Sequence, residues 1–297
     1  MPSLRRRHFS VPEREAPLVI AHRGASGLAP ENTPAAFRLA MALGADGVEM
    51  DVQLSADDQV VVIHDARVDR TTRRRGPVAG FTAAELGRMN ASEWFERRLM
   101  MRPRLRAMIE RTSAPFGLDG WLGAGGSVPA LASVLELLAP ARLRRVYIEL
   151  KGPKVGTSLL LNKAIALVRQ FSMERSVTLL SFDHAVVALA RKLAPDIRTA
   201  ATFPVPGVRL TTPRAILAAA GEAGADEAAL HFGLATRRTV AALHERGLAV
   251  SAWTANSKII MRRLISSGVD SIMTNYPNRL VEVLEASGGG RQSSRRR

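Results

Sequence analysis

The sequence of 297 residues has no cysteine, and only 5% of its residues are aromatic. A chain without cysteine forms neither a disulfide framework nor a thiolate zinc site. No stretch has the roughly 20 uninterrupted apolar residues of a membrane span, and no early apolar run is long enough for a signal-peptide core. Together with 46% hydrophobic residues, these absences predict a globular, cytoplasmic protein that is stabilised by its core.

Basic residues are in excess, with 42 lysines and arginines against 27 acidic residues and a formal net charge of +15. Such a charge makes nucleic acids and anionic membranes candidate partners. Much of the excess lies near the two ends, in the arginines at 5–7 and 295–297. We expect residues 1–16 and 287–297 to be disordered basic ends that flank a single domain at 17–286.

A second basic cluster covers residues 97–111, where arginines are interleaved with leucine, methionine and isoleucine. It fits an amphipathic surface element that makes peripheral contact with an anionic membrane. It also fits the solvated face of an inserted helix whose apolar residues cover the rest of the domain, which is the commoner outcome. We expect no specific nucleic-acid partner.

From residue 18 onward, short apolar segments rich in β-branched residues alternate with segments of helical period. This alternation is typical of repeated βα units, and the length suits one TIM (β/α)8 barrel of ~250 residues. The predicted strands are 18–22, 46–54, 60–64, 145–151, 176–181, 197–202, 225–230, 247–253 and 269–274. The predicted helices are 34–43, 82–90, 130–139, 157–171, 184–193, 212–221, 236–246, 257–267 and 277–286.

These nine strands are one more than an eight-stranded barrel requires. The loop at 55–59 is too short for a parallel crossover, so 60–64 should return antiparallel to 46–54 as a hairpin. Residues 65–127 are rich in glycine and proline, and we predict a small insertion there. A doubly wound open sheet is the alternative fold, but no GxGxxG motif follows the first strand.

His22 and Arg23 end the first predicted strand in the motif HRGAS, and strand carboxyl ends hold the active site of a barrel. A histidine can transfer protons near neutral pH, and an arginine matches phosphate oxygens. Gly24 lets the backbone turn close to a ligand. In the PENT motif, Thr33 and Pro34 suit the cap and the first position of a helix, so this motif is at least partly structural.

Glu49 and Asp51 are separated by one residue in a predicted strand, so their side chains point to the same face. Two inward carboxylates repel one another unless a cation neutralises them, and oxygen ligands favour Mg²⁺ or Ca²⁺. Glu149 and Lys151 share a face in the same way in the motif IELKG. Glu149 can complete the metal site while Lys151 meets a phosphate oxygen; a salt bridge between them without a ligand is the alternative.

His64 and Asp65 follow the predicted hairpin, which brings a second histidine toward the first. Cleavage of a phosphodiester needs one group that takes a proton and one that delivers a proton to the leaving oxygen. Asp65 either orients its neighbour or caps the turn. Trp253 ends another predicted strand, where its ring either lines the mouth of the pocket or fills the core.

The motifs HRGAS, PENT, EMD, IHD, VPAL, IELKG, WTAN and GVDSIMTNYP occur in this order from about residue 18 to 285. Together they resemble the glycerophosphodiester phosphodiesterase family. The resemblance implies a TIM barrel with a small insertion after IHD, and hydrolysis of glycerophosphodiesters to an alcohol and glycerol 3-phosphate. It also implies the site roles: His22 and His64 as the acid and base, Glu49, Asp51 and Glu149 as divalent-metal ligands, and Arg23 and Lys151 as phosphate contacts.

Leu28 stands where the family often has an aromatic residue, which removes a stacking contact to the alcohol. Two other functions compete with the one implied. Phospholipase D-like hydrolysis of lysophospholipids would use the same barrel and residues, and the basic stretch at 97–111 motivates it. A non-catalytic nucleic-acid or membrane-binding protein would use the charge of +15, but it leaves the inward acidic residues unexplained.

Overall fold

The structure is a computed structural model that describes residues 16–101, 106–107, 126–151, 157–205 and 212–287. Its strands are β1 Leu18–His22, β2 Gly47–Leu54, β3 Val60–Val62, β4 Arg145–Leu150, β5 Val177–Ser181, β6 Arg198–Phe203, β7 Glu227–His231, β8 Ala249–Trp253 and β9 Ser271–Thr274. Its helices are α1 Pro34–Ala42, α2 Ala83–Gly87, α3 Glu93–Met100, α6 Leu131–Leu138, α7 Thr157–Gln170, α8 His184–Leu193, α9 Pro213–Glu222, α10 Arg237–His244, α11 Lys258–Ser267 and α12 Pro277–Ala286. The predicted basic ends lie outside the described residues, apart from 16 and 287.

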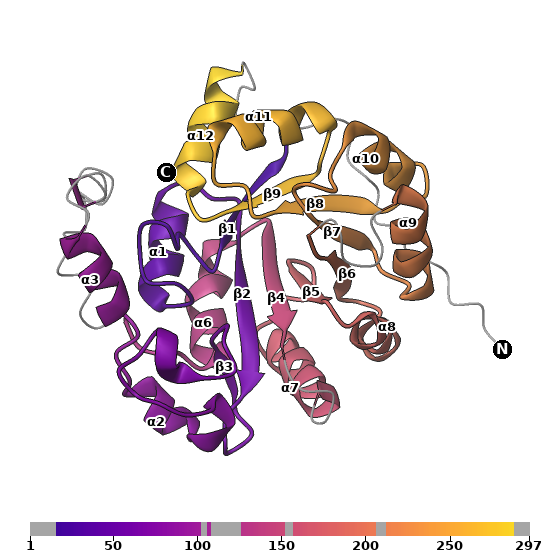
Figure 1. Ribbon diagram of the computed structural model, residues 1–297. Helices are drawn as coiled ribbons and strands as arrows, with labels where there is room; N and C mark the ends of the chain where they lie inside the picture. The colour runs from indigo at the N-terminus through magenta and orange to yellow at the C-terminus, as the bar shows by residue number, and fades with distance from the viewer. Residues whose placement is uncertain (1–15, 102–105, 108–125, 152–156, 206–211, 288–297) are drawn as a thin grey trace.

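Eight parallel strands close into a barrel, and the helices surround it (Figure 1). The order around the ring is β1, β9, β8, β7, β6, β5, β4 and β2, and a pairing between β1 and β2 closes it. β3 lies outside the ring and pairs antiparallel with β2 alone. The predicted TIM barrel with an added hairpin strand is therefore confirmed, and the open doubly wound sheet is wrong.

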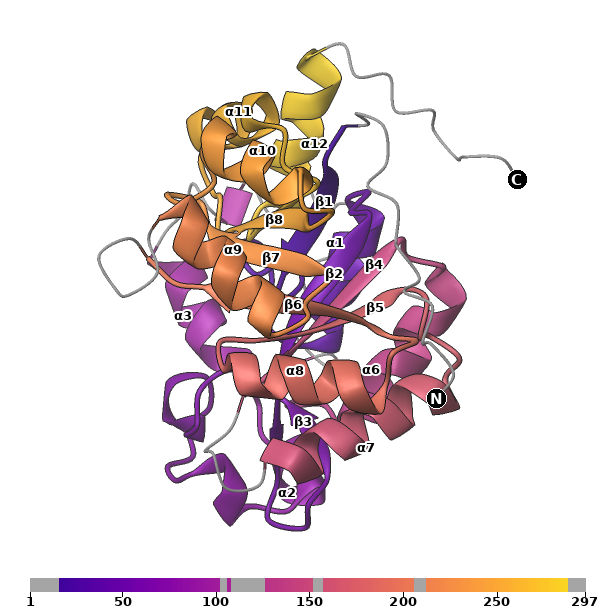
Figure 2. The same cartoon turned by 90° about the vertical axis from the view of Figure 1, so that its right-hand side faces the viewer.

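Alternation along the strands decides which side chains enter the barrel. On β2, Val48 and Met50 are buried in the apolar layer between the barrel and its helices. Glu49 and Asp51 alternate with them and face the interior. Figure 2 shows the outer helices that cover the strands from a second side. A strand that is apolar on its outer face thus carries charge at the centre of the molecule.

The turn between β1 and α1 is fixed by short local contacts. Thr33 caps α1, since its side-chain oxygen accepts a hydrogen bond from the backbone N–H of Ala36 at 3.3 Å. Pro34 occupies the first turn, as its fixed φ favours. Gly24 has φ of +74°, and a Cβ there would lie 2.6 Å from the backbone carbon of Ala36. Only glycine allows the chain to pass this close to the helix.

The insertion between β3 and α6 holds two short 3₁₀ turns, Val68–Arg70 and Val78–Gly80, together with α2 and α3. α2 lies beside β3 in both views (Figures 1 and 2). On α3, Phe95 and Leu99 are buried in the main core. Residues 97–99 of the cluster therefore lie on a helix that packs on the barrel through Leu99, whereas Met101 directly after it is 78% exposed. Contact of the cluster with a membrane stays a prediction. No helix in the described ranges is both long and apolar enough to cross a membrane.

Candidate active site

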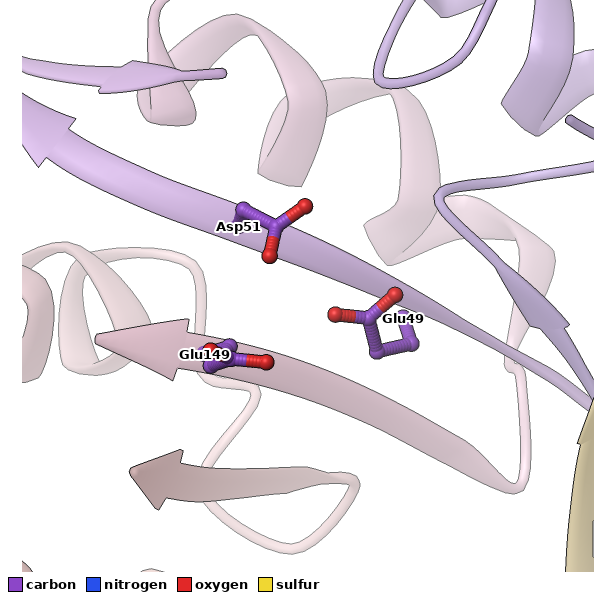
Figure 3. A group of neighbouring side chains, drawn as sticks. All are labelled: Glu49, Asp51 and Glu149. Atoms are coloured by element: carbon purple, nitrogen blue, oxygen red, sulfur yellow. The ribbon is translucent and has the colours of Figure 1, made fainter. Parts of the chain in front are cut away.

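Three carboxylates meet inside the barrel: Glu49 and Asp51 from β2, and Glu149 from β4 (Figure 3). β2 and β4 are parallel neighbours, and their register places Asp51 opposite Glu149. One oxygen from each carboxylate lies within 4.8 Å of the others, and all three residues are buried. The structure thus brings together the three residues that the sequence suggested as metal ligands.

The carboxylate cluster strongly opposes its own ionisation. Burial raises the pKa of Glu149 to about 7, and the charge of Asp51 adds to this effect. Burial and the same neighbour raise the pKa of Glu49 well above its usual value. Within the part of the chain that the structure describes, Glu49 Oε1 is buried without a hydrogen-bond partner. An orphaned oxygen in a crowded set of carboxylates fits a hard divalent cation, which prefers oxygen ligands.

Lys151 and Arg23 border the carboxylate cluster. Lys151 Nζ lies 2.5 Å from Glu149 Oε1 and 3.3 Å from Asp51 Oδ1, so Lys151 forms salt bridges with both carboxylates. Arg23 Nε lies 3.1 Å from Asp51 Oδ2, and the Arg23 backbone N–H donates to Glu49 Oε2 at 2.9 Å. Burial raises the pKa of Asp51, but the charges of Arg23 and Lys151 outweigh it and lower that pKa. Asp51 is therefore the carboxylate that stays ionised without a cation.

His22 reaches the carboxylate cluster from the end of β1. Its Nδ1 lies 2.8 Å from Asn275 Oδ1, and its Nε2 lies 3.8 Å from Glu49 Oε2. Burial and the charge of Arg23 lower the pKa of His22 to about 4. Since the ring is neutral at pH 7 and its Nδ1 donates to the Asn275 carbonyl oxygen, Nε2 is free to accept a proton.

His64 follows the end of β3, and Gln53 on β2 holds it there. Gln53 Nε2 lies 2.8–3.0 Å from the carbonyl oxygens of Ile63, His64 and Asp65. His64 Nδ1 lies 2.6 Å from Asp65 Oδ1. Burial raises the pKa of Asp65, but hydrogen bonds from Arg70 and His64 outweigh it and bring the pKa to about 2. An ionised Asp65 only accepts, so Nδ1 donates and Asp65 orients its neighbour.

Sequence reasoning missed several residues that hold this site in place. Asn32 donates to Asp51 Oδ2 at 2.9 Å, and Glu31 accepts from Arg23 at 2.9 Å. Both belong to PENT, in which the sequence analysis assigned a role only to Thr33, as a helix cap. Arg70 and Asn275 come from loops after β3 and β9. Their roles depend on how those loops close over the barrel, and no spacing rule predicts that.

Trp253 both packs inward and borders the site. Its ring is half-buried against the apolar cluster inside the barrel, and its Nε1 donates to the Ala229 carbonyl oxygen at 3.1 Å. It meets Phe182 edge to face, with ring centroids 5.5 Å apart. Lys151 Nζ lies 5.7 Å from the centroid of Phe182. Trp253 therefore packs inside the barrel, and its role in lining the mouth of the pocket stays a prediction.

Comparison with known proteins adds an independent line of evidence. The model of the glycerophosphoryl diester phosphodiesterase family matches residues 22–279. A glycerophosphodiester phosphodiesterase of Caldanaerobacter subterraneus is 33% identical over 286 residues, which cover 91% of this chain and 99% of that protein. The residues that the family model matches include every proposed site residue.

Solved structures share the same fold. A crystal structure from Silicibacter pomeroyi, assigned to the same family, is 28% identical with a TM-score of 0.80, covering 93% of this chain and 95% of that one. A phosphodiesterase from Oleispira antarctica, solved in complex with the product sn-glycerol-3-phosphate, has a TM-score of 0.75 at 23% identity. That alignment covers 91% of this chain and 97% of the other.

Proposed function

Because the chain belongs to the glycerophosphoryl diester phosphodiesterase family, we propose that its barrel interior hydrolyses glycerophosphodiesters to an alcohol and glycerol 3-phosphate. The observation that carries this proposal is the buried group formed by Glu49 and Asp51 on β2 and by Glu149 near the carboxyl end of β4. The product bound to the Oleispira antarctica phosphodiesterase supports the choice of product. That relative has the same barrel.

Charge balance supports metal dependence. The site and its border hold five carboxylates and three cationic side chains, which leaves two negative charges when all are ionised: Glu31, Glu49, Asp51, Asp65 and Glu149 against Arg23, Arg70 and Lys151. One Mg²⁺ or Ca²⁺ held by Glu49, Asp51 and Glu149 would neutralise them. Such an ion would supply positive charge where negative charge grows on the diester oxygens.

The two histidines have the environments that a proton relay needs. His22 is neutral and presents a free Nε2, so it suits the group that takes a proton from the attacking oxygen. His64 Nδ1 donates to ionised Asp65, whose negative charge would stabilise the ring when it takes up a second proton. His64 therefore suits the group that protonates the leaving alcohol oxygen. Different surroundings for two similar side chains are how a site assigns opposite roles.

The remaining groups suit the two ends of the substrate. Arg23 and Lys151 offer positive charge to the phosphate oxygens. Trp253 and Phe182 form an apolar wall next to Lys151 that suits the carbon atoms of a glycerol moiety. Leu28 is buried in the main core, so it contributes no stacking surface for the alcohol. We therefore expect broad tolerance toward the alcohol group.

Two substitutions test this assignment directly. His64→Ala and Glu49→Ala should each lower kcat for glycerophosphocholine by a factor of ~10³ or more, because each removes a group that acts at the reacting phosphate. Both proteins should keep the circular dichroism spectrum of the wild type. His244→Ala is the matched control, since His244 pairs with Asp270 and not with the site. A folded and fully active His64→Ala protein contradicts the assignment.

The choice between glycerophosphodiesters and lysophospholipids can be measured on the same protein. Leu99 faces the core, whereas Met101, directly after α3, is 78% exposed. A single exposed methionine offers little apolar surface to a lipid tail. We expect kcat/KM for glycerophosphocholine to exceed that for micellar lysophosphatidylcholine at least ~10-fold. A preference for the lysolipid would favour the rival function.

A further inference from the structure

Arg70, the last residue of the first 3₁₀ turn, is bonded through all three of its guanidinium nitrogens. Its Nε lies 2.5 Å from Asp65 Oδ2, and its Nη2 lies 3.3 Å from Asp65 Oδ1. Its Nη1 and Nη2 donate to the two oxygens of Glu31 at 2.9 and 2.7 Å. One planar guanidinium group therefore donates hydrogen bonds to two carboxylates at once, and only arginine has a side chain with this arrangement of donors.

Each of these carboxylates also holds a residue of the proposed machinery. Asp65 Oδ1 accepts from His64 Nδ1 at 2.6 Å. Glu31 Oε1 accepts from Arg23 Nη1 at 2.9 Å. A continuous chain of charged hydrogen bonds thus runs from the histidine on the hairpin, through Arg70, to the arginine after β1. Without Arg70, both carboxylates would lose their principal cationic partner.

The insertion keeps Arg70 in this position. The guanidinium carbon of Arg70 lies 6.0 Å from the centroid of the Trp94 ring on α3. Glu93, the first residue of the same helix, pairs with Arg73 three residues beyond Arg70. The 3₁₀ turn and the residues directly after it therefore contact α3. This arrangement limits the rotamers open to a side chain that is 43% exposed.

We propose that Arg70 is a positioning residue that fixes His64 through Asp65 and Arg23 through Glu31, so that both act on the same phosphodiester. The inference rests on the proposed function. Asp65 selects the His64 ring form with hydrogen on Nδ1, and Arg70 keeps Asp65 at the angle that this bond requires. A residue that only tethered the insertion would leave the orientation of His64 unchanged.

Steady-state kinetics separate these two roles. Arg70→Ala should lower kcat for glycerophosphocholine by ~10- to 100-fold, the range for loss of a supporting hydrogen bond, while KM changes less than threefold. Arg70→Lys should recover only part of the loss, because a lysine cannot bond both carboxylates through a planar fork. The matched control is Arg67→Ala in the same turn. Arg67 is 59% exposed and pairs with Asp69 alone among the described residues, so its loss should leave kcat unchanged.

A double-mutant cycle tests whether Arg70 acts through Asp65. Asp65→Asn should lower kcat by itself, and the further loss from Arg70→Ala should be smaller in that background than in the wild type, because only the route through Glu31 remains. Additive losses in the cycle overturn the proposed route. If Arg70→Ala does not fold, Arg70→Lys takes its place in the cycle, and full activity of Arg70→Lys likewise overturns the proposal.

Proton NMR gives a readout that does not depend on turnover. The short bond from His64 Nδ1 to Asp65 should give a low-field imidazole N–H resonance that is lost in His64→Ala. We expect this resonance to survive in Arg67→Ala and to broaden or disappear in Arg70→Ala. If the wild type shows the resonance and its dependence on Arg70 but no hydrolysis, the proposed function fails and the positioning role stands. If the wild type hydrolyses the substrate and Arg70→Ala changes neither kcat nor the resonance, the positioning role fails alone.

Discussion

Gly24 and Gly44 have the same left-handed backbone in different surroundings. Their φ angles are +74° and +75°. A Cβ at Gly24 would lie 2.6–2.8 Å from atoms of Ala36, whereas a Cβ at Gly44 would meet nothing within 4 Å. Substitution at these two glycines therefore separates two contributions to the loss of stability: the left-handed backbone, which both share, and the close packing of the HRG turn on Ala36, which only Gly24 has.

Alanine at each position should show this difference. Gly44→Ala should lower the free energy of unfolding by ~1 kcal/mol, which is the left-handed penalty alone. Gly24→Ala should lower it by ~3 kcal/mol, because the helix must also move. Only Gly24→Ala should lower kcat, since it displaces Arg23. Urea denaturation measures both losses, and equal values would show that the contact with Ala36 costs nothing.

Among the elements, the β2–β3 hairpin has the clearest effect on function. Near the site, Ile63 N–H donates to the Asp51 carbonyl oxygen at 2.9 Å and links the residue after β3 to β2. Gln53 then secures the end of the hairpin through three carbonyl oxygens. A strand outside the barrel ring thus delivers His64 to residues inside it.

Gln53→Leu should therefore disturb His64 without removing any reacting group. We expect kcat to fall ~10- to 100-fold, as for other supporting contacts, with little change in cation affinity. Gln59→Ala, in the exposed turn of the same hairpin, is the control and should be fully active. Kinetics together with calorimetric titration of Mg²⁺ check both expectations. A large fall in Mg²⁺ affinity in Gln53→Leu would place its effect on the carboxylates instead.

The elements themselves follow closely from local sequence pattern. All nine predicted strands form, and the alternation on β2 correctly indicated which side chains enter the barrel. The predicted strand at 60–64 ends at Val62. The carbonyl oxygens of Ile63, His64 and Asp65 accept from the Gln53 side chain instead of continuing the strand pairing. Local pattern cannot identify Arg70 as a partner of Glu31 or Asn275 as a partner of His22, because each pair joins segments that are far apart in the sequence.

For the molecule as a whole, the carboxylate cluster links folding to cation binding and pH. Without a cation, burial and the charge of Asp51 raise the pKa of Glu149 to about 7, from ~4.3 in an unfolded chain. The protonated carboxyl therefore favours the folded state fully below pH ~4.3, and this contribution is lost as the pH rises through 7. A bound cation restores the lost stability, because it pairs with the ionised form.

We therefore expect saturating Mg²⁺ or Ca²⁺ to raise Tm more at pH 8 than at pH 5. Without cation, the protein should be less stable at pH 8 than at pH 5 by ~1 kcal/mol or more from Glu149 alone. Glu149→Gln should reduce both differences, because the amide does not ionise. Differential scanning fluorimetry with and without EDTA measures them. A gain in Tm that is equal at both pH values would contradict this link.

The central claim is that one divalent cation is held by Glu49, Asp51 and Glu149 between the two histidines. Anomalous diffraction from a crystal grown with Mn²⁺, as an anomalous stand-in for Mg²⁺, and sn-glycerol 3-phosphate tests it most directly. We predict one strong anomalous peak within ~2.0–2.3 Å of an oxygen from each carboxylate, with the phosphate beside it and next to Arg23 and Lys151. Phosphate bound in the barrel with no anomalous peak among the three carboxylates, or with the peak elsewhere, would contradict the account.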